Sequence, residues 1–369
     1  MTVSGTNLFA GTFGSGVFLS ANNGTNWTAI NSGLTNKYVL SLAVSGTNLF
    51  AGTWGGGTFL STNNGTNWTA INSGLTNTDV RSLAVSGTKL FVGTFGSGVF
   101  LSTNNGTSWS EVNSGLTNKY VVSLAVSGTN LFAGTWGGGA FLTTNNGTNW
   151  TAVNSGLANT DVISLAVSGT NLFAGTSGGG VFISTNNGTS WTAINSGLPS
   201  WYVLSLAVSG TNLFAGTGDR GIFLSTNNGT SWTAISSGLT DMTVGSLAVS
   251  GTNLFAGAKS GVWRRPLLEM ITSVENLQTD MPTQFSLEQN YPNPFNPTTT
   301  IKYNLPKAGL VKITIYDILG REIRVLVKEE KNPGVYEVKF DAKNLTSGVY
   351  IATIQANNFS KSIKLLLTK

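Results

Sequence analysis

Short apolar runs separated by turn residues recur throughout the first two thirds of the chain. In one unit the runs cover residues 41–45, 49–53, 58–61 and 68–72, and they are rich in Val, Leu, Phe and Thr. The segments between them contain Gly46-Thr47-Asn48, Gly55-Gly56-Gly57 and Asn63-Asn64-Gly65. Short β-rich runs bounded by Gly and Asn predict strands joined by tight turns. No run has the 3.6-residue periodicity of a helix, so the pattern predicts four strands in each unit.

This unit repeats with a period of 41 residues. Six tryptophans keep that spacing without a slip: Trp27, Trp68, Trp109, Trp150, Trp191 and Trp232. A Val-Ser-Gly-Thr segment begins seven times, at Val3, Val44, Val85, Val126, Val167, Val208 and Val249. Four strands in a unit of about 40 residues predict a blade of a β-propeller. We therefore expect an all-β propeller over residues 1–267 with seven blades, the last of them one strand short.

The last third of the chain has a different pattern. From Met270 to Pro282 the repeat is absent and the composition turns polar, which predicts a linker over residues 268–283. From residue 284 to residue 369, segments of alternating apolar and polar residues predict about seven short strands, as at Val311, Ile313 and Ile315. Such a series predicts an antiparallel β-sandwich of immunoglobulin-like type.

An eight-residue segment, Ser/Thr-x-Asn-x-Gly-x-x-Trp, ends at each of the six repeated tryptophans. The Asn oxygen can accept backbone hydrogen bonds within the turn, Gly can adopt a left-handed conformation, and Trp can pack between strands. These segments resemble the Asp-box of the BNR-repeat propellers, a superfamily that includes sialidases, sortilin-like receptors and photosystem assembly factors of the Ycf48 kind. Asn stands where that family usually has Asp, so we do not expect the segment to bind a cation. The predicted structural residues are Asn22, Gly24, Trp27, Asn63, Gly65, Trp68, Asn104, Gly106, Trp109, Asn145, Gly147, Trp150, Asn186, Gly188, Trp191, Asn227, Gly229 and Trp232.

Three motifs near the C-terminus occur in a fixed order. They span residues 285–297, 316–322 and 345–350, and their most distinctive residues are Tyr291, Pro292, Asn293, Pro294, Phe295, Asp317, Gly320, Arg321, Gly348 and Tyr350. Residues 284–369 resemble the type A C-terminal sorting domain of the type IX (Por) secretion system of Bacteroidetes and relatives. The resemblance implies a partner, the type IX secretion machinery, and an extracellular or outer-surface location. The other interpretation is an accessory adhesion module.

The first residues of the given sequence do not fit export by the type IX secretion system. Met1 lies within the first strand of the first unit, and Met1-Thr2-Val3-Ser4 shows no signal-peptide pattern. We expect that the natural chain begins further upstream, with a signal peptide and a missing strand or further blades. Whether the sorting domain is removed after export stays open.

Composition excludes several kinds of chemistry. The chain contains neither Cys nor His, which removes disulfides, thiolate nucleophiles, the usual general base and the commonest metal ligands. Residues 1–262 hold six basic and five acidic side chains, scattered singly, whereas nucleic-acid binding needs a clustered basic face. No apolar run approaches the roughly 20 residues that span a bilayer. We expect no cofactor, no metal, no nucleic-acid partner and no transmembrane segment.

The repeats differ mainly in two loops, the turn between the second and third strands and the connection between blades. Because antiparallel strands reverse direction, these two loops are predicted to share one face, and the invariant turns the opposite face. Exposed aromatics beside glycines suggest a surface that stacks sugars or peptides, although the rings could simply cover the blade ends. The candidate ligand-binding residues are Phe13, Tyr38, Trp54, Phe95, Tyr120, Trp136, Trp201, Tyr202, Asp219 and Arg220.

Three functions remain open from the sequence. The favoured one is an exported, non-enzymatic propeller that binds a glycan or a surface protein through the variable loops. The second is a sialidase-like glycoside hydrolase or lyase, but the repeats lack an arginine triad and hold a single glutamate, Glu111. Glycoside hydrolysis generally needs two carboxylates across a cleft, and Asp79 and Asp161 are predicted to lie on separate blades. The third is a structural adhesin component without a small ligand.

Overall fold

The chain divides into two units, and it is an all-β protein. The structure, a computed structural model, describes residues 1–271 and 284–368, and its two units are Met1–Ile271 and Thr272–Lys369. The predicted linker, residues 268–283, is wrong in its first part, because residues 267–271 are helical and the Met270 side chain is completely buried. The remainder of that linker lies outside the described residues.

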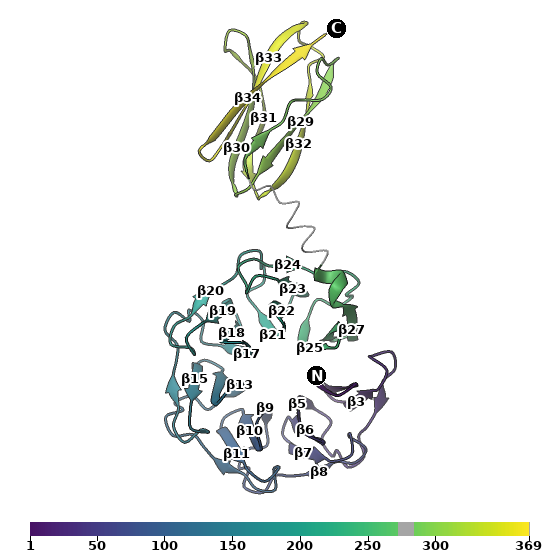
Figure 1. Cartoon of the computed structure of the whole chain (residues 1–369), viewed down its shortest axis with the longest axis vertical. Coiled ribbons are helices and arrows are strands. Elements are labelled where there is room, and N and C mark those ends of the chain that lie inside the picture. The colour runs from purple at the N-terminus through teal and green to yellow at the C-terminus, as the bar shows by residue number, and fades with distance from the viewer. Residues whose placement is uncertain (272–283, 369) are drawn as a thin grey trace. The chain divides into compact units, whose positions relative to one another are not determined.

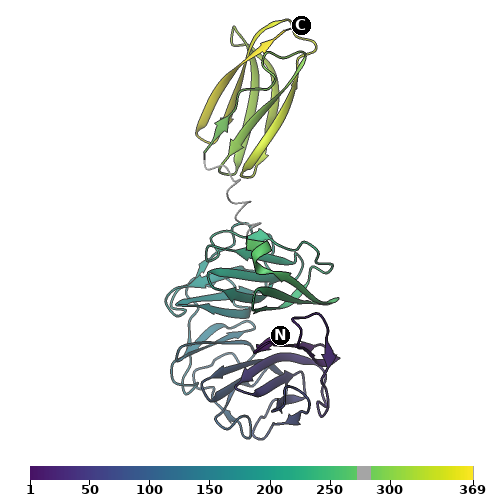
Figure 2. The same ribbon diagram turned by 45° about the vertical axis from the view of Figure 1, so that its right-hand side comes forward.

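The first unit is a β-propeller whose sheets are arranged around a central axis (Figure 1). In the described part of the unit there are seven sheets, of which six have four strands and the seventh has three, as predicted. Each sheet is a simple antiparallel up-and-down meander, such as β5-β6-β7-β8, and the strands within a sheet run side by side (Figure 2).

The strands of the propeller follow the sequence repeat. The first strands, nearest the axis, are β1 (Thr2–Ser4), β5 (Val39–Ser45), β9 (Val80–Ser86), β13 (Val121–Ser127), β17 (Val162–Ser168), β21 (Val203–Ser209) and β25 (Val244–Ser250). The second strands are β2 (Asn7–Thr12), β6 (Asn48–Thr53), β10 (Lys89–Thr94), β14 (Asn130–Thr135), β18 (Asn171–Thr176), β22 (Asn212–Thr217) and β26 (Asn253–Ala258). The third strands are β3 (Gly16–Ser20), β7 (Gly57–Ser61), β11 (Gly98–Ser102), β15 (Gly139–Thr143), β19 (Gly180–Ser184), β23 (Ile222–Ser225) and β27 (Gly261–Pro266). The fourth strands are β4 (Thr28–Ala29), β8 (Thr69–Ala70), β12 (Ser110–Glu111), β16 (Thr151–Ala152), β20 (Thr192–Ala193) and β24 (Thr233–Ala234).

The core of the propeller lies between neighbouring sheets. One hydrophobic cluster contains Phe9 and Val17 of the first blade together with Val39, Leu49 and Trp68 of the second blade. The second strand is buried on both faces, which explains why its sequence is an apolar run without alternation. A glycine in that strand lets the next sheet approach, because a Cβ on Gly11 would lie 2.6 Å from Val39 Cγ1.

The ring closes between the last and the first blade through their inner strands. At four other junctions a serine on one inner strand accepts a hydrogen bond from a backbone N–H of the next, as from Leu83 to Ser41 at 3.0 Å. At the closure the amino group of Met1 donates to the equivalent serine, Ser246, at 3.0 Å, and Figure 1 shows the N-terminus beside β25.

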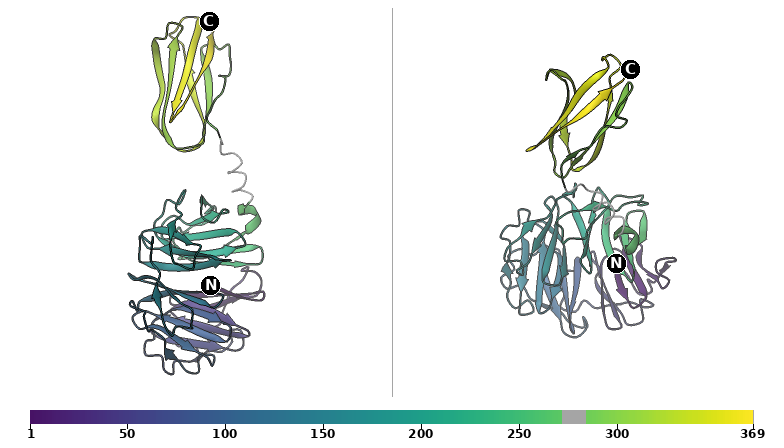
Figure 3. Two further views of the ribbon diagram at one scale, coloured as in Figure 1. Left: turned by 60° about the vertical axis from the view of Figure 1, so that its left-hand side comes forward. Right: turned by 45° about the horizontal axis from the view of Figure 1, so that its top comes forward.

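The second unit is a sandwich of two antiparallel sheets (Figure 3). One sheet has the order β28 (Ser286–Leu287), β29 (Thr298–Leu305) and β32 (Gly334–Asp341). The other has the order β31 (Glu322–Lys331), β30 (Gly309–Asp317), β33 (Gly348–Ala356) and β34 (Phe359–Leu367). Its core contains alternate residues of both sheets, among them Ile301, Tyr303, Ile313, Ile315 and Ile354.

Candidate ligand-binding face

The two variable loops of the propeller meet on one face. Phe13, in the turn after β2, forms an antiparallel bridge with Tyr38, in the connection between the first two blades, and their rings touch edge to face at 4.9 Å. On the other face the invariant turns of the first and seventh blades, at Gly5, Asn22, Gly251 and Thr252, border a shared hollow. The repeat therefore separates a uniform face from a variable one.

Three aromatic rings form an exposed cluster on the variable face, the Phe13 cluster, made of Phe13, Tyr38 and Trp54. Phe13 stacks on Trp54 with 5.4 Å between ring centroids, and Tyr38 meets Trp54 edge to face at 5.9 Å. Phe13 remains 67% exposed and Trp54 46% exposed. These rings thus contact one another and still present apolar surface to solvent.

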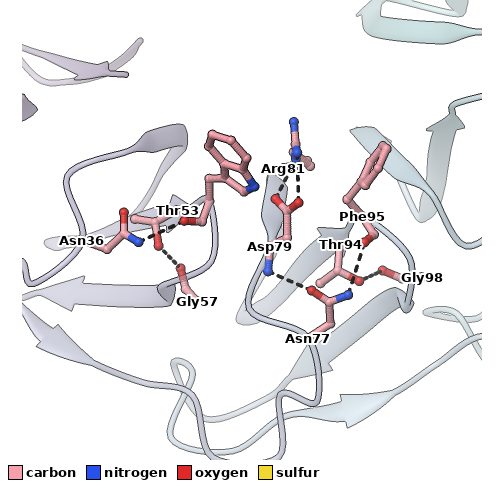
Figure 4. A network of polar contacts seen from close by, with 10 residues as sticks. Asn36, Thr53, Gly57, Asn77, Asp79, Arg81, Thr94, Phe95 and Gly98 are labelled. Carbon is pink, nitrogen blue, oxygen red and sulfur yellow. Dashed lines mark hydrogen bonds and ion pairs between the residues drawn. The ribbon is translucent and has the colours of Figure 1, made fainter. Parts of the chain in front are cut away.

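An ion pair connects this cluster to the next aromatic pair. Arg81 donates two hydrogen bonds to Asp79, from Nε to Oδ1 at 2.7 Å and from an Nη to Oδ2 at 2.9 Å (Figure 4). The guanidinium carbon of Arg81 lies 4.8 Å from the centre of the Phe95 ring and 5.9 Å from that of Trp54. Phe95 in turn contacts Tyr120 at 4.9 Å. A bidentate carboxylate and two rings fix the guanidinium in one position.

Asparagine side chains hold both loops in place. Asn36 donates to the Trp54 carbonyl and accepts from the Tyr38 N–H, both at 2.9 Å, and Asn118 does the same for Trp136 and Tyr120. Asn77 makes the equivalent bonds to Phe95 and Asp79 (Figure 4). Sequence reasoning missed these anchors, although Asn36, Asn77, Asn118 and Asn159 recur at the 41-residue period, directly before the two residues of the connection that vary most.

The face opens at the central axis into a hollow of about 450 Å³. Phe95 and Trp136 line it together with one residue from each of six inner strands: Leu40, Arg81, Val122, Ile163, Leu204 and Gly245. Arg81 is the single charged side chain in this largely apolar lining. Sequence reasoning also missed this ring of residues. They occupy the one inner-strand position whose residue type changes in nearly every repeat, and that variation could have indicated them.

The remaining candidate residues lie on the connection to the sixth blade and its turn. Tyr202 bridges Ser177 as Tyr38 bridges Phe13, and Trp201 occupies the position of Lys37 and Lys119. Asp219 accepts a hydrogen bond from Ser200 at 2.5 Å and forms an ion pair of 3.5 Å with Arg220. Trp136, Trp201 and Tyr202 are each about half exposed.

The repeated eight-residue segments lie on the uniform face and tie blades together. In the second blade Ser61 Oγ donates to Asn63 Oδ1 and accepts from the Gly65 N–H, and Asn63 Oδ1 also accepts from the Asn67 N–H. The indole N–H of Trp68 donates to the Ile30 carbonyl of the preceding blade at 2.7 Å. Trp109, Trp150, Trp191 and Trp232 repeat this inter-blade bond at 2.6–2.7 Å.

The glutamate of the repeats is not arranged as an acid catalyst. Glu111 accepts hydrogen bonds from Asn113 at 2.7 Å and from Lys119 at 3.0 Å. The Asn113 bond, followed by that of Lys119, lowers the pKa of Glu111 below its usual value, whereas a general acid at neutral pH needs a raised one. Within the described ranges no three acidic side chains gather into a metal-binding group. No helix in those ranges is long and apolar enough to cross a membrane.

The sorting-motif residues of the second unit differ in burial and in position. Phe295 is buried in the core, whereas Tyr291, at the other end of the same motif, is strongly exposed. The other two motifs meet around one hollow of about 520 Å³, lined by Asp317, Arg321, Gly348 and Tyr350 among others. Arg321 Nε donates to Asp317 Oδ2 at 2.7 Å, and backbone N–H groups of Leu319 and Arg321 donate to Oδ1.

Family comparisons agree with this division of the chain. Residues 289–368 match the family described as secretion system C-terminal sorting domain. This match supports the prediction of a sorting domain in that part of the chain. That domain indicates a secreted or cell-surface protein. Residues 120–260 match the family described as DUF6242 beta propeller domain.

Solved structures share the fold at low identity. PorZ of Porphyromonas gingivalis, described as an essential bacterial surface component of the type IX secretion system, is 18% identical with a TM-score of 0.54. The alignment covers 100% of this chain but 59% of PorZ, so the chain spans little more than half of that protein. Ycf48 bound to D1 peptide is 14% identical with a TM-score of 0.58, over 70% of this chain and 88% of Ycf48.

An enzyme is also among the structures with this fold. The GH74 xyloglucanase of Xanthomonas campestris is 14% identical with a TM-score of 0.55, over 81% of this chain and 56% of the enzyme. No curated protein matches the sequence. Identities this low establish the propeller fold and leave activity to be argued from the site.

Proposed function

We propose that this protein binds a carbohydrate chain at the cell surface through the variable face of its propeller, without cleaving it. The observation that carries the proposal is the group of aromatic rings on this face: Phe13, Trp54 and Trp136 are exposed, and the partly buried Phe95 lines the axial hollow together with Trp136. Sugar rings present flat C–H faces that pack on aromatic side chains, and such exposed rings are uncommon without a partner.

Polar groups beside the rings support a sugar ligand. Arg81 keeps donor hydrogens beyond the two it gives to Asp79, and it lies between two stacking surfaces. Because Asp79, Phe95 and Trp54 already fix its position, little side-chain entropy would be lost when it donates to a ligand hydroxyl. The apolar hollow beside it could receive one sugar unit at the axis.

Binding without hydrolysis is supported by the state of the carboxylates. Asp79 is engaged by Arg81, Asp219 by Ser200 and Arg220, and Asp241 by the Thr243 N–H, while the hydrogen bonds of Glu111 lower its pKa. Among the acidic residues of 1–262, this leaves Asp161 as the one free carboxylate. A glycoside hydrolase instead needs one protonated and one free carboxyl group across the bond that breaks. Release of reducing sugars from a bound polysaccharide would contradict this part of the proposal.

Affinity electrophoresis of the full chain in gels containing soluble polysaccharides tests the proposal. We expect retardation in at least one β-glucan, mannan or acidic polysaccharide, and loss of that retardation in the Trp54→Ala variant. Lys89→Ala, an exchange on a strand outside the variable face, is the matched control and should leave mobility shifts unchanged. Equal retardation of wild type and Trp54→Ala would remove Trp54 from the site, and no retardation in any polysaccharide would contradict sugar binding.

A further inference from the structure

The second and fourth blades carry the same pair of residues on the variable face. Trp54 with Asp79, and Trp136 with Asp161, occupy equivalent positions two repeats apart. The backbone N–H of each aspartate donates to the asparagine anchor two residues before it, at 2.8 and 2.9 Å. The backbone N–H of each tryptophan donates to a tyrosine carbonyl, at 2.9 Å in both blades. The same backbone therefore presents a tryptophan and an aspartate in both blades.

In the second blade a guanidinium accompanies this pair. Arg81 donates two hydrogen bonds to the Asp79 carboxylate (Figure 4). Its guanidinium carbon lies 5.9 Å from the centre of the Trp54 ring and 4.8 Å from that of Phe95. A carboxylate beside a cation and a ring face against it both favour the charged group. The chain itself thus shows which kind of group this pair holds.

The fourth blade has the same pair without a cation. Ile163 stands at the position of Arg81, and it lines the axial hollow together with Trp136. Asp161 is partly exposed, and its carboxylate has no hydrogen-bond or ion-pair partner among the described residues. Its Oδ1 lies 4.0 Å from the place that a Cβ on Gly137 would take, in the turn directly after Trp136. The carboxylate is therefore available to a cation on a ligand.

We propose that Trp136 and Asp161 bind an amino sugar whose amino group is free and protonated. This inference rests on the proposed binding of a carbohydrate chain and names one sugar unit that the chain contains. The sugar ring stacks on Trp136, which is 51% exposed, and its ammonium group donates to the Asp161 carboxylate. Because a partly buried charge pair is screened less than one in open solvent, the pair can distinguish an amine from its neutral acetylated form.

The residue opposite the tryptophan favours a sugar over the guanidinium of a partner protein. In the second blade Phe95 lies against the Arg81 guanidinium, so a flat cation is held between two rings. The fourth blade has the partly exposed Ser177 in place of Phe95. A serine leaves more room than a phenylalanine, and its hydroxyl can donate to or accept from a sugar hydroxyl. A puckered ring with several hydroxyls suits this space better than a planar cation.

Isothermal titration calorimetry of the full chain with two matched ligands tests this inference. One is a chitosan oligosaccharide, whose glucosamine units carry free amino groups, and the other is the chitin oligosaccharide of the same length, in which these groups are acetylated. In a mildly acidic buffer the amines are protonated and aspartate stays ionised. We expect the chitosan oligosaccharide to bind at least tenfold more tightly, by a margin that decreases as salt is added. Because the chain has a formal net charge of +5, non-specific attraction of a cationic ligand cannot produce this preference.

Two substitutions at the site should remove the preference. Asp161→Asn removes the charge and keeps the shape of the side chain, and Ile163→Arg supplies an internal guanidinium as in the second blade. Both variants should bind the two oligosaccharides with equal affinity. Glu111→Gln, the matched control, removes a negative charge on the outer strand β12, where Lys119 pairs with it, and should keep the preference.

Several outcomes would overturn the inference. They are equal affinity of the wild type for both oligosaccharides, no binding of either one, and a preference that persists in Asp161→Asn and in Ile163→Arg. Binding of an arginine-rich peptide that depends on Asp161, without an amine preference among the oligosaccharides, would assign the site to a protein partner instead. Retardation in polysaccharide gels that depends on Trp54 would leave the proposed function intact in each of these cases, whereas its absence would contradict sugar binding itself.

Discussion

The two faces of the propeller use the same repeat for different purposes. On the uniform face, the polar groups of each eight-residue segment form hydrogen bonds within their own turn. The tryptophan of the segment donates a hydrogen bond to the neighbouring blade. On the variable face, asparagines hold the loops while aromatic rings point outward. An aromatic residue is therefore structural or available for binding according to which side of the blade carries it, and residue type alone does not decide this.

The largest expected effect concerns the tryptophans of the uniform face. Trp109→Ala removes a buried indole and its bond to the Ile71 carbonyl, so the free energy of unfolding should fall by about 3–5 kcal/mol. Trp27→Ala should lower the free energy of unfolding by less, because its ring is half-buried. Denaturant unfolding of both variants measures the difference, and equal losses would show that the first and third blades are held alike.

A smaller effect is expected from the anchors of the variable face. Asn118→Ala removes the side chain that joins the Tyr120 N–H to the Trp136 carbonyl, which should lower the free energy of unfolding by about 1–2 kcal/mol. The substitution should also increase the motion of the two loops, and amide hydrogen exchange around residues 118–120 and 136 should become faster. Unchanged exchange there would mean that the loops hold their shape without the asparagine.

The smallest effect concerns the sorting domain at low pH. Hydrogen bonds from the Arg321 backbone, and then from its side chain and the Leu319 backbone, lower the pKa of Asp317 below its ordinary value. A lowered folded-state pKa stabilises the fold above the unfolded-state pKa of about 4, and this contribution is lost as pH falls through the folded-state value. Asp317→Asn should flatten the acid dependence of the domain's unfolding temperature below about pH 4. An acid dependence identical to the wild type would exclude Asp317 as its source.

Much of the fold could be predicted because its determinants are local and repeated. The spacing of Trp27, Trp68 and the later tryptophans, together with the Asn-Gly turns, predicted the blades, their number and the short seventh sheet. Alternation at Val311, Ile313 and Ile315 predicted the sandwich. The helical turn at residues 267–271 was missed because five residues are too few to show a helical period, and the burial of Met270 depends on tertiary packing.

The candidate site was less visible in the sequence. The aromatic residues stand out by type, but the sequence does not say that Arg81 lies between Trp54 and Phe95 or that it shares a hollow with Trp136. The sequence gives no sign that Leu40, Val122 and Ile163 differ from other strand residues. They line a common hollow because the blades close into a ring. The asparagine anchors depend on two loops that are 18 residues apart and meet in space.

Isothermal titration calorimetry tests the central claim most directly. Glycan-array screening of the full chain would supply the ligand, and its dissociation constant would be measured for wild type and for the Trp54→Ala/Trp136→Ala double variant. Because aromatic anchors each contribute about 1–2 kcal/mol or more to such sites, we predict at least a tenfold weaker affinity with an unchanged unfolding transition. Equal affinity of wild type and double variant would contradict the claim that the variable face of the propeller is the binding site.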